Sequence, residues 1–286
     1  MLGLSDTPLL YLAMDRTNWK LGKIHINLLV LGVRYHGINI PLAWTSLGKA
    51  GSSSTAERIS LLKRFMRFQK DRLFVLTADR EFIGEEWFQF LRKKRIPFVI
   101  RIKGSTHVRR PKCEHSVPAQ ELFKRLRKKK KTALNELYEV YGISVFIAAA
   151  RNQEGELLIV VSNQFCRKAI KEYLKRWGIE CLFSCLKTRG FNLENTHITK
   201  PSRISALFFV LVIVFVWSMR TGVNTRKLSP TRRASHGRKR NSIFRRGLDA
   251  LKRCIIHSDS YFERLMKFIG LIFEEKPLKS ICEGGF

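Results

Sequence analysis

The sequence has few acidic residues for its length of 286 residues. Asp and Glu number 23 against 54 Lys and Arg, so the formal net charge is +31 at pH 7. An excess this large repels itself in a compact chain unless an acidic partner neutralises it. Nucleic acid is therefore the expected partner, ahead of an anionic membrane surface.

The chain also lacks the marks of an exported protein. Its N-terminal segment carries no Lys or Arg, and Asp6 and Pro8 interrupt the apolar stretch that a signal peptide needs. The six cysteines include no C-x2-C pair, and His107, Cys113 and His115 lack a second ligand pair. We therefore expect a reducing cytoplasm and no structural zinc site.

No apolar run is as long as a membrane-spanning helix. The longest, from Ala206 to Trp217, has twelve residues, whereas a span needs about twenty. The pattern predicts a buried core helix at 204–219. Arg203 and Arg220 flank the run and keep a membrane-associated protein open as an alternative.

Short apolar runs separated by polar residues and glycine predict a mixed α/β fold. Two helices are expected, one at 57–68, where Leu62 and Phe65 recur at helical spacing, and one at 84–94. This element order excludes a helical bundle or a repeat array. The expected strands are 9–14, 24–33, 38–44, 73–77 and 98–102.

Composition then divides the chain further. The segment Arg109–Lys131 holds ten basic residues against two acidic ones, and two β-rich runs follow it as a hairpin. A helix is expected at 168–189, a basic linker at 221–246 without Asp or Glu, and an amphipathic helix at 244–273. The predicted segments are a first α/β part, a β-rich basic insertion, a second α/β part and a basic helical C-terminal region: 1–102, 103–165, 166–220 and 221–286.

Two of the six Asp residues, Asp15 and Asp79, stand at the carboxyl ends of expected strands. Taken singly, such a residue is most often part of a turn. Arg80 and Glu81 beside Asp79 either orient it or form only an ion pair within the loop.

A third acid lies on the helix after the insertion. Tyr173, Arg176, Glu180 and Lys187 fall within an arc of about 60° at about 100° per residue. An exposed ladder pairing Arg176 with Glu180 is the plain alternative. It does not explain why Tyr173 and Lys187 share the same face.

Three carboxylates on so basic a chain indicate a particular chemistry. They would repel a DNA phosphate unless they held divalent cations, and Mg²⁺ favours a few carboxylates together with phosphate oxygens. Two such ions activate an attacking oxygen and stabilise the leaving oxygen. Arg176, Lys187 and Tyr173 would contact neighbouring phosphates. The pattern therefore predicts cleavage of phosphodiester bonds.

The sequence resembles the bacterial insertion sequence 4 family of DDE transposases. Residues 173–187 match the signature Tyr-x2-Arg-x3-Glu-x6-Lys in full, and AMDRTNW around Asp15 and TADREF around Asp79 are similar to the family's first two acidic motifs. GFNLENTH and HGRKRNSIFRRGLD are similar to its later segments. The resemblance covers nearly the whole chain.

The resemblance implies a ribonuclease H-like mixed sheet flanked by helices and interrupted by a β-rich insertion. It also implies two Mg²⁺ or Mn²⁺ ions held by Asp15, Asp79 and Glu180, with Tyr173, Arg176 and Lys187 on the DNA. The implied reactions are hydrolysis at transposon ends, a DNA hairpin step and strand transfer into target DNA. The implied protein is a homodimer on paired double-stranded ends, associated with the bacterial nucleoid and not with a membrane.

One departure from the family concerns the N-terminus. Family members carry a DNA-recognition region before the first Asp, whereas Asp15 comes almost at once here. We therefore expect a truncated copy that keeps the catalytic core and lacks this region. A non-catalytic, basic nucleic-acid-binding protein is the alternative function, and it predicts a steep salt dependence with no metal-dependent product.

Overall fold

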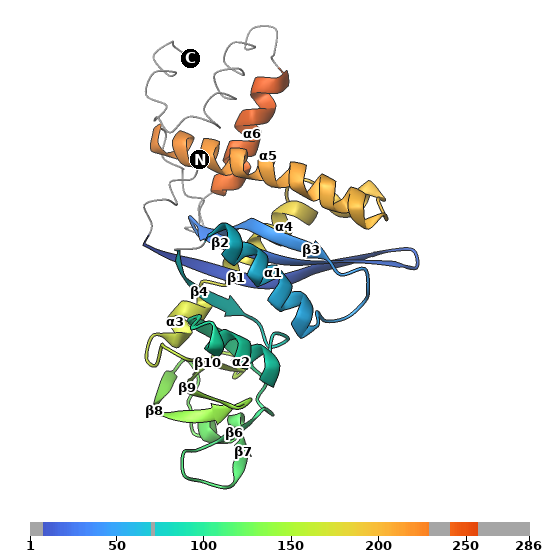
Figure 1. Cartoon of the computed structure of the whole chain (residues 1–286). Coiled ribbons are helices and arrows are strands. Elements are labelled where there is room, and N and C mark those ends of the chain that lie inside the picture. Colours follow the sequence, from blue (N-terminus) through green and yellow to red (C-terminus); the bar gives the residue numbers. More distant parts are fainter. Residues whose placement is uncertain (1–7, 70–71, 229–240, 257–286) are drawn as a thin grey trace. The chain divides into compact units, whose positions relative to one another are not determined.

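The computed structural model describes residues 8–69, 72–228 and 241–256 (Figure 1). The chain divides into two compact units. The larger unit holds residues 9–183 together with 199–201, and the smaller unit holds Pro8, residues 184–198 and the described residues from 202 onward. Each unit is described by itself.

A ten-stranded mixed sheet forms the larger unit, in the order β3-β2-β1-β4-β5-β10-β9-β8-β6-β7. The first three strands form an antiparallel meander, and β4 and β5 run parallel to β1. The strands are β1 (Leu9–Leu21), β2 (Ile24–Tyr35), β3 (Ile38–Ser46), β4 (Leu73–Ala78), β5 (Phe98–Ile102), β6 (His107–Arg109), β7 (Ser116–Pro118), β8 (Lys131–Val140), β9 (Ile143–Arg151) and β10 (Leu157–Ser162).

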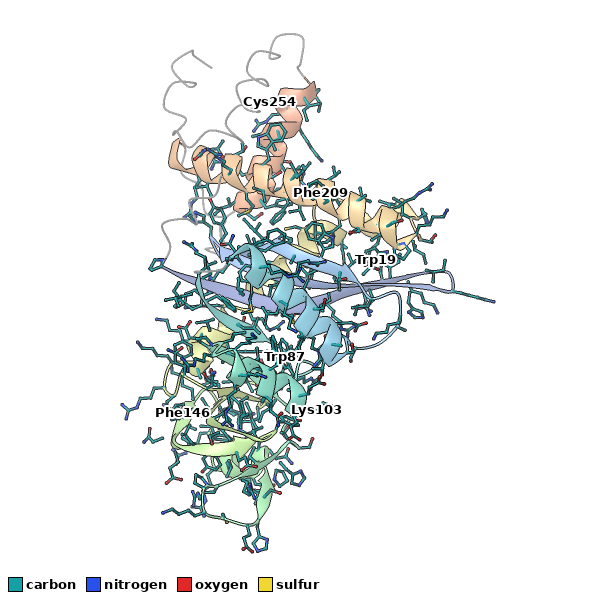
Figure 2. The ribbon with its side chains drawn as sticks, viewed as in Figure 1. Trp19, Trp87, Lys103, Phe146, Phe209 and Cys254 are labelled. Carbon is teal, nitrogen blue, oxygen red and sulfur yellow. The ribbon has the colours of Figure 1, made fainter. Side chains whose placement is uncertain are left out.

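Helices cover the two faces of this sheet, and side-chain alternation along the strands assigns them. Phe74 of β4 contacts α1 (Thr55–Phe68), and Phe98 of β5 contacts α2 (Glu85–Lys93), so these two helices share one face (Figure 1). Trp87 of α2, labelled in Figure 2, is fully buried. The neighbouring residues Val75 and Val99 pack on the other face, against α3 (Ala169–Leu174).

The mixed α/β prediction is confirmed, with each expected strand present. β1 continues to Leu21, beyond its expected end, because it pairs with β2 as far as Leu21 and Ile24. The insertion adds β6 to β10 to the same sheet, since β10 pairs with β5, and it contains a short 3-10 helix, η1 (Ala119–Phe123). The boundaries of the four predicted segments stay predictions.

The expected single helix at 168–189 is wrong. It is broken into α3 and α4 (Trp177–Lys187) by a turn at Lys175 and Arg176. The backbone N–H of Arg176 donates to the carbonyl of Tyr173 at 2.9 Å, and that of Ile179 donates to Arg176 at 2.9 Å. These bonds to the third preceding residue tighten the chain and end the regular α-helix.

In the smaller unit, α5 (Pro201–Leu228) crosses α6 (Ile243–Ile256), and η2 (Leu193–Thr196) precedes them. A Cβ on Gly247 would come within 1.7 Å of the Ser218 carbonyl, so the two helices touch backbone to backbone. α5 includes 221–228 of the predicted linker, and α6 matches the start of the predicted helix at 244–273. The remainder of both, 229–240 and 257–273, lies outside the described residues.

α5 contains the predicted core helix at 204–219. Its residues Pro201–Arg226 are long and apolar enough to cross a membrane by length and composition, and 39% of the most apolar window is buried. A core helix of a soluble protein passes the same test. Phe208 and Phe215 are buried as predicted, whereas Phe209, Val210 and Ile213 are exposed, so the core prediction holds for only one side of the helix.

Gly178 allows α4 to lie against β3. A Cβ there would stand 2.3 Å from Asn39 Oδ1 and 3.1 Å from the backbone carbon of Ile38. Asn39 is buried and cannot move freely, since its amide donates to the carbonyl of Gly32 at 3.0 Å.

Gly178→Ala is expected to lower the free energy of unfolding by about 1–3 kcal/mol, because the added methyl overpacks a rigid contact. Urea denaturation measures the change. Gly104→Ala is the matched control, because its Cβ would meet only the Gln120 side chain, and the one close contact, at 2.8 Å, is with the flexible amide end. Equal effects of the two substitutions would contradict the packing argument.

Candidate active site

Asp15 and Asp79 follow directly on the last pair of the parallel β1–β4 ladder, which joins Met14 to Ala78. Asp15 is still within β1, opposite Val30 of β2. Both Asp residues occupy positions on the face that α3 covers, since they continue the alternation of Tyr11 and Val75. The two carboxylates therefore come from adjacent strands at the point where the strands separate.

Tyr173 and Arg176 bring the third carboxylate to the same place. The Tyr173 hydroxyl donates to Asp79 Oδ1 at 3.1 Å. The Arg176 guanidinium donates to Asp15 Oδ2 at 2.5 Å and to Glu180 Oε1 at 3.1 Å. The break between α3 and α4 lies in this segment, so the tight turn carries the residue that links Asp15 to Glu180.

Arg176 does not belong to an exposed ladder. Its side chain is 9% exposed and Asp15 is 14% exposed, and the pair joins residues 161 positions apart. The alternative of a simple surface pair between Arg176 and Glu180 is therefore wrong. Arg176 Nε is buried without a hydrogen-bond partner among the described residues.

Burial has the largest influence on the pKa values of the site's ionisable groups. It raises the pKa of Asp15 to about 7, although Arg176 and the N–H of Arg16 lower it. Burial also raises the pKa of Tyr173 to about 12, so its hydroxyl keeps the proton that it donates to Asp79. Burial alone would lower the pKa of Arg176, but Tyr173, the two Asp residues and Glu180 raise it.

Lys187 is the last of the four signature residues. It is the last residue of α4 and belongs to the smaller unit, where its ammonium pairs with Glu194 at 2.9 Å. The structure therefore groups three of the four signature residues, Tyr173, Arg176 and Glu180, with Asp15 and Asp79.

Two arginines near the site, Arg101 and Arg16, were not predicted from the sequence. Arg101 of β5 approaches Asp79 Oδ1 at 3.7 Å, and Arg16 binds Glu81 through two hydrogen bonds of 2.6 Å each. The signal for Arg101 was the parity of β5, which places it on the face of Val99 and thus of the site. Nothing in the local sequence indicates that Arg16 and Glu81 meet.

The donor atoms suit a hard divalent cation in kind. Three carboxylates offer only oxygen, and Mg²⁺ binds through few carboxylates with phosphate oxygens completing its shell. The guanidinium of Arg176 stands between Asp15 and Glu180. In the described ranges, no three His, Cys, Asp or Glu side chains are grouped closely enough to hold an ion as they stand.

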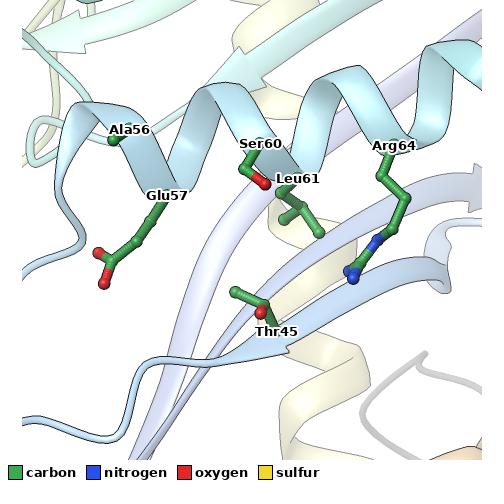
Figure 3. Close-up of a pocket in the computed structure, with 6 residues that line it drawn as sticks. All are labelled: Thr45, Ala56, Glu57, Ser60, Leu61 and Arg64. Carbon is green, nitrogen blue, oxygen red and sulfur yellow. The ribbon is translucent and has the colours of Figure 1, made fainter.

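A hollow of about 290 Å³ lies between α1 and β3, with Glu57 and Arg64 at its sides and Thr45 below them (Figure 3). None of the residues lining it is Asp15, Asp79 or Glu180. The carboxylate cluster and this hollow are separate features.

An exposed basic run follows η1 in the insertion. Residues Arg127 to Lys131 are all exposed, and the segment reaches the start of β8. A run of this kind attracts a polyanion without sequence preference.

Comparison with known proteins identifies the family. The profile of the family described as "Transposase DDE domain" matches residues 12–217. The chain belongs to this family. No curated protein matches the chain.

Among solved structures, the piggyBac transposase in a synaptic complex with hairpin DNA is 11% identical, with a TM-score of 0.47, covering 94% of this chain and 55% of that one. The magnesium-bound catalytic core of HTLV-2 integrase is 17% identical, with a TM-score of 0.25 and coverage of 32% and 59%. Endonuclease V from Bacillus subtilis is 11% identical, with a TM-score of 0.35 and coverage of 65% and 83%. This chain thus spans about half the length of the piggyBac chain.

The raised pKa of Asp15 predicts a pH-dependent stability in metal-free buffer. Because its folded pKa of about 7 exceeds the ordinary value of 3.8, this group favours folding below the ordinary pKa, and the contribution is lost as the pH rises through about 7.

The stability difference between wild type and Asp15→Asn is therefore expected to shift against the wild type between pH 5 and pH 8. Urea denaturation with EDTA at intermediate pH values measures it. Parallel stability curves for the two proteins would show that Asp15 titrates normally.

Proposed function

We propose that this chain is a DNA transposase of the insertion sequence 4 type, which cleaves transposon ends and joins them to target DNA. The observation that carries the proposal is the convergence of Asp15, Asp79 and Glu180 on Tyr173 and Arg176. Membership of the transposase DDE family supports it, because that family implies hydrolysis and transesterification of phosphodiester bonds.

The topology supports a ribonuclease H-like core within this proposal. An antiparallel meander of β1 to β3 continues into parallel β4 and β5. Asp15 and Asp79 lie where the pairing of β1 with β4 ends, and Glu180 lies on α4, after the last strand. The β-rich insertion enters between β5 and α3. These are the features that the signature residues led us to expect.

Asp15, Asp79 and Glu180 would hold the divalent ions. Once bound, a pair of Mg²⁺ or Mn²⁺ ions would activate the attacking oxygen and stabilise the leaving oxygen. Asp15 must give up its proton to serve as a ligand, which its pKa of about 7 allows at neutral pH.

Tyr173, Arg176 and Lys187 would contact the DNA backbone. Arg176 Nε is buried and has no hydrogen-bond partner among the described residues, so it is a donor that a phosphate oxygen would satisfy once the guanidinium moves. Tyr173 holds Asp79 through its hydroxyl and keeps that carboxylate oriented.

The further steps in the proposal are a hairpin intermediate, formed when the released 3′-hydroxyl attacks the opposite strand, and strand transfer by that hydroxyl. The partners are double-stranded transposon ends and target DNA, bound by a homodimer. The place of action is the bacterial cytoplasm, at the nucleoid.

Asp15→Asn, Asp79→Asn and Glu180→Gln are each expected to abolish Mg²⁺-dependent cleavage, because the amide removes a charged ligand. The substrate is a linear duplex that carries the DNA flanking this gene, and strand cleavage is followed on denaturing gels. DNA affinity is measured in parallel and should be retained.

Glu139→Gln is the matched control, since Glu139 pairs with Arg109 at an exposed site in the insertion. It should cleave at the wild-type rate. Cleavage retained by the three site variants would overturn the assignment, and a wild-type protein that binds DNA without a metal-dependent product would favour the non-catalytic alternative.

Replacing Lys128, Lys129 and Lys130 by Gln is expected to weaken DNA binding and to flatten its dependence on salt. The slope of log affinity against log salt should fall by about 0.9 for each lysine that contacts a phosphate. Fluorescence anisotropy with a short duplex at several salt concentrations measures it.

The triple change Arg92→Gln, Lys93→Gln and Lys94→Gln at the end of α2 removes the same charge from another exposed site. It should leave the slope closer to wild type. Equal slopes for the two triple variants would mean that net charge alone, and not the insertion, binds DNA.

A further inference from the structure

Arg16 and Glu81 form a bidentate ion pair between the two segments that carry Asp15 and Asp79. Arg16 follows Asp15, and Glu81 lies two residues after Asp79. Arg16 Nε donates to Glu81 Oε1 and Arg16 Nη2 donates to Oε2, both at 2.6 Å. The side chains are 15% and 23% exposed. Two parallel bonds fix distance and orientation together.

The third nitrogen of Arg16 ties the pair to the neighbouring loop. Arg16 Nη1 donates to Asn27 Oδ1 at 3.2 Å and to the carbonyl of Gly51 at 2.7 Å. The Asn27 amide is buried on β2 and donates to the carbonyls of Lys49 and Gly51 at 3.0 and 2.8 Å. Every guanidinium nitrogen of Arg16 is therefore engaged.

A second arginine holds the loop that follows Asp79. Arg58 of α1 is buried and donates to the carbonyls of Glu81 at 2.9 Å and Ile83 at 3.3 Å. Its guanidinium also binds Ser53 and lies 5.2 Å from the centre of the Phe82 ring. The loop is thus fixed through its backbone by Arg58 and through Glu81 by Arg16.

This network lies behind the candidate site. Asp15 and Arg16 alternate along β1, so Arg16 is on the face of the sheet opposite Asp15, the face that α1 covers. Neither Arg16 nor Glu81 is hydrogen-bonded to Asp79 or Glu180 in the described structure. The pair reaches Asp15 in two ways: the Arg16 backbone N–H donates to Asp15 Oδ1 at 2.8 Å, and the charge of the Arg16 guanidinium acts on Asp15 across the strand.

The β1–β4 ladder ends just before the two acids. Hydrogen-bonded pairing of β1 with β4 ends at Met14 and Ala78, one residue before each Asp. No ladder pair therefore sets the separation of Asp15 from Asp79. The next cross-connection along both segments is the Arg16–Glu81 pair.

We propose that the Arg16–Glu81 ion pair, supported by Arg58, is a positioning clamp that sets the spacing of the Asp15 and Asp79 carboxylates for divalent cations. The inference rests on the proposed function of those two carboxylates. Arg16 and Glu81 are positioning residues, because they act through the strand and loop that they join.

The test measures Mn²⁺ binding to the full chain without DNA, by the electron paramagnetic resonance of free and bound Mn²⁺. Glu81→Ala and Arg16→Lys are each expected to weaken Mn²⁺ binding by about 10- to 100-fold. Lysine keeps the charge but cannot span both Glu81 oxygens, so Arg16→Lys separates geometry from charge. Glu81→Gln retains one acceptor and should fall between Glu81→Ala and wild type.

Glu139→Gln again serves as the control, because it removes a carboxylate from an exposed ion pair. Wild-type Mn²⁺ affinity in both Glu81→Ala and Arg16→Lys would overturn the clamp, even if their melting temperatures fell. If Glu81→Ala does not fold, the Mn²⁺ affinities of Arg16→Lys and Glu81→Gln are compared with that of the wild type instead.

Asp15→Asn and Asp79→Asn distinguish this failure from failure of the proposed function. If these two variants lose Mn²⁺ while the clamp variants keep it, the carboxylates are ligands and the clamp is wrong. If Asp15→Asn and Asp79→Asn also bind Mn²⁺ as wild type does, the proposed metal site fails and the clamp with it.

Discussion

The ion pair between Arg176 and Asp15 is the interaction on which the candidate site depends. Both side chains are largely buried, and a buried carboxylate or guanidinium without a counter-charge is strongly destabilising. Arg176 satisfies this requirement for Asp15 and reaches Glu180 as well. Asp15, Asp79 and Glu180 thus gather around Arg176 and Tyr173 in a chain whose formal net charge is +31. That contrast supports the proposal that the site holds cations beside a polyanion.

The two faces of the sheet carry different parts of the site. One face carries Asp15 and Asp79 together with α3, and the other carries Arg16 with α1 behind them. Successive residues of one strand thus serve different purposes, since alternation sends their side chains to opposite faces. The arrangement permits a carboxylate to be positioned by its sequence neighbour without any direct contact between the two side chains. It also keeps the guanidinium groups of Arg16 and Arg58 on the face opposite Asp15 and Asp79, so they do not compete with Arg176 for the carboxylate oxygens.

The insertion extends the sheet that holds the carboxylates. Its strand β10 pairs with β5, and β5 carries Arg101 beside Asp79. The exposed basic run at Arg127 to Lys131 is therefore joined to the site through continuous hydrogen-bonded strands within one unit. Backbone pairing of this kind is stiff, so a polyanion bound along the run would meet a sheet of fixed geometry.

The sequence by itself determined the mixed α/β class, the succession of the first five strands along the chain and the helix signature, because these follow from local apolar periodicity and short-range spacing. It did not place Asp15 correctly at the end of its strand, because β1 continues through Asp15 to Leu21 by pairing with β2. It could not determine that α3 and α4 separate at Arg176. The tight turn there leaves Tyr173, Arg176 and Glu180 on nearly the same side, so the helical spacing of these residues does not reveal the break. Nor could it pair Arg16 with Glu81, which lie 65 positions apart and meet only because β1 and β4 are adjacent. The tertiary structure alone decided which of the many arginines are structural and which face the acids, because that depends on strand parity and on burial across distant segments.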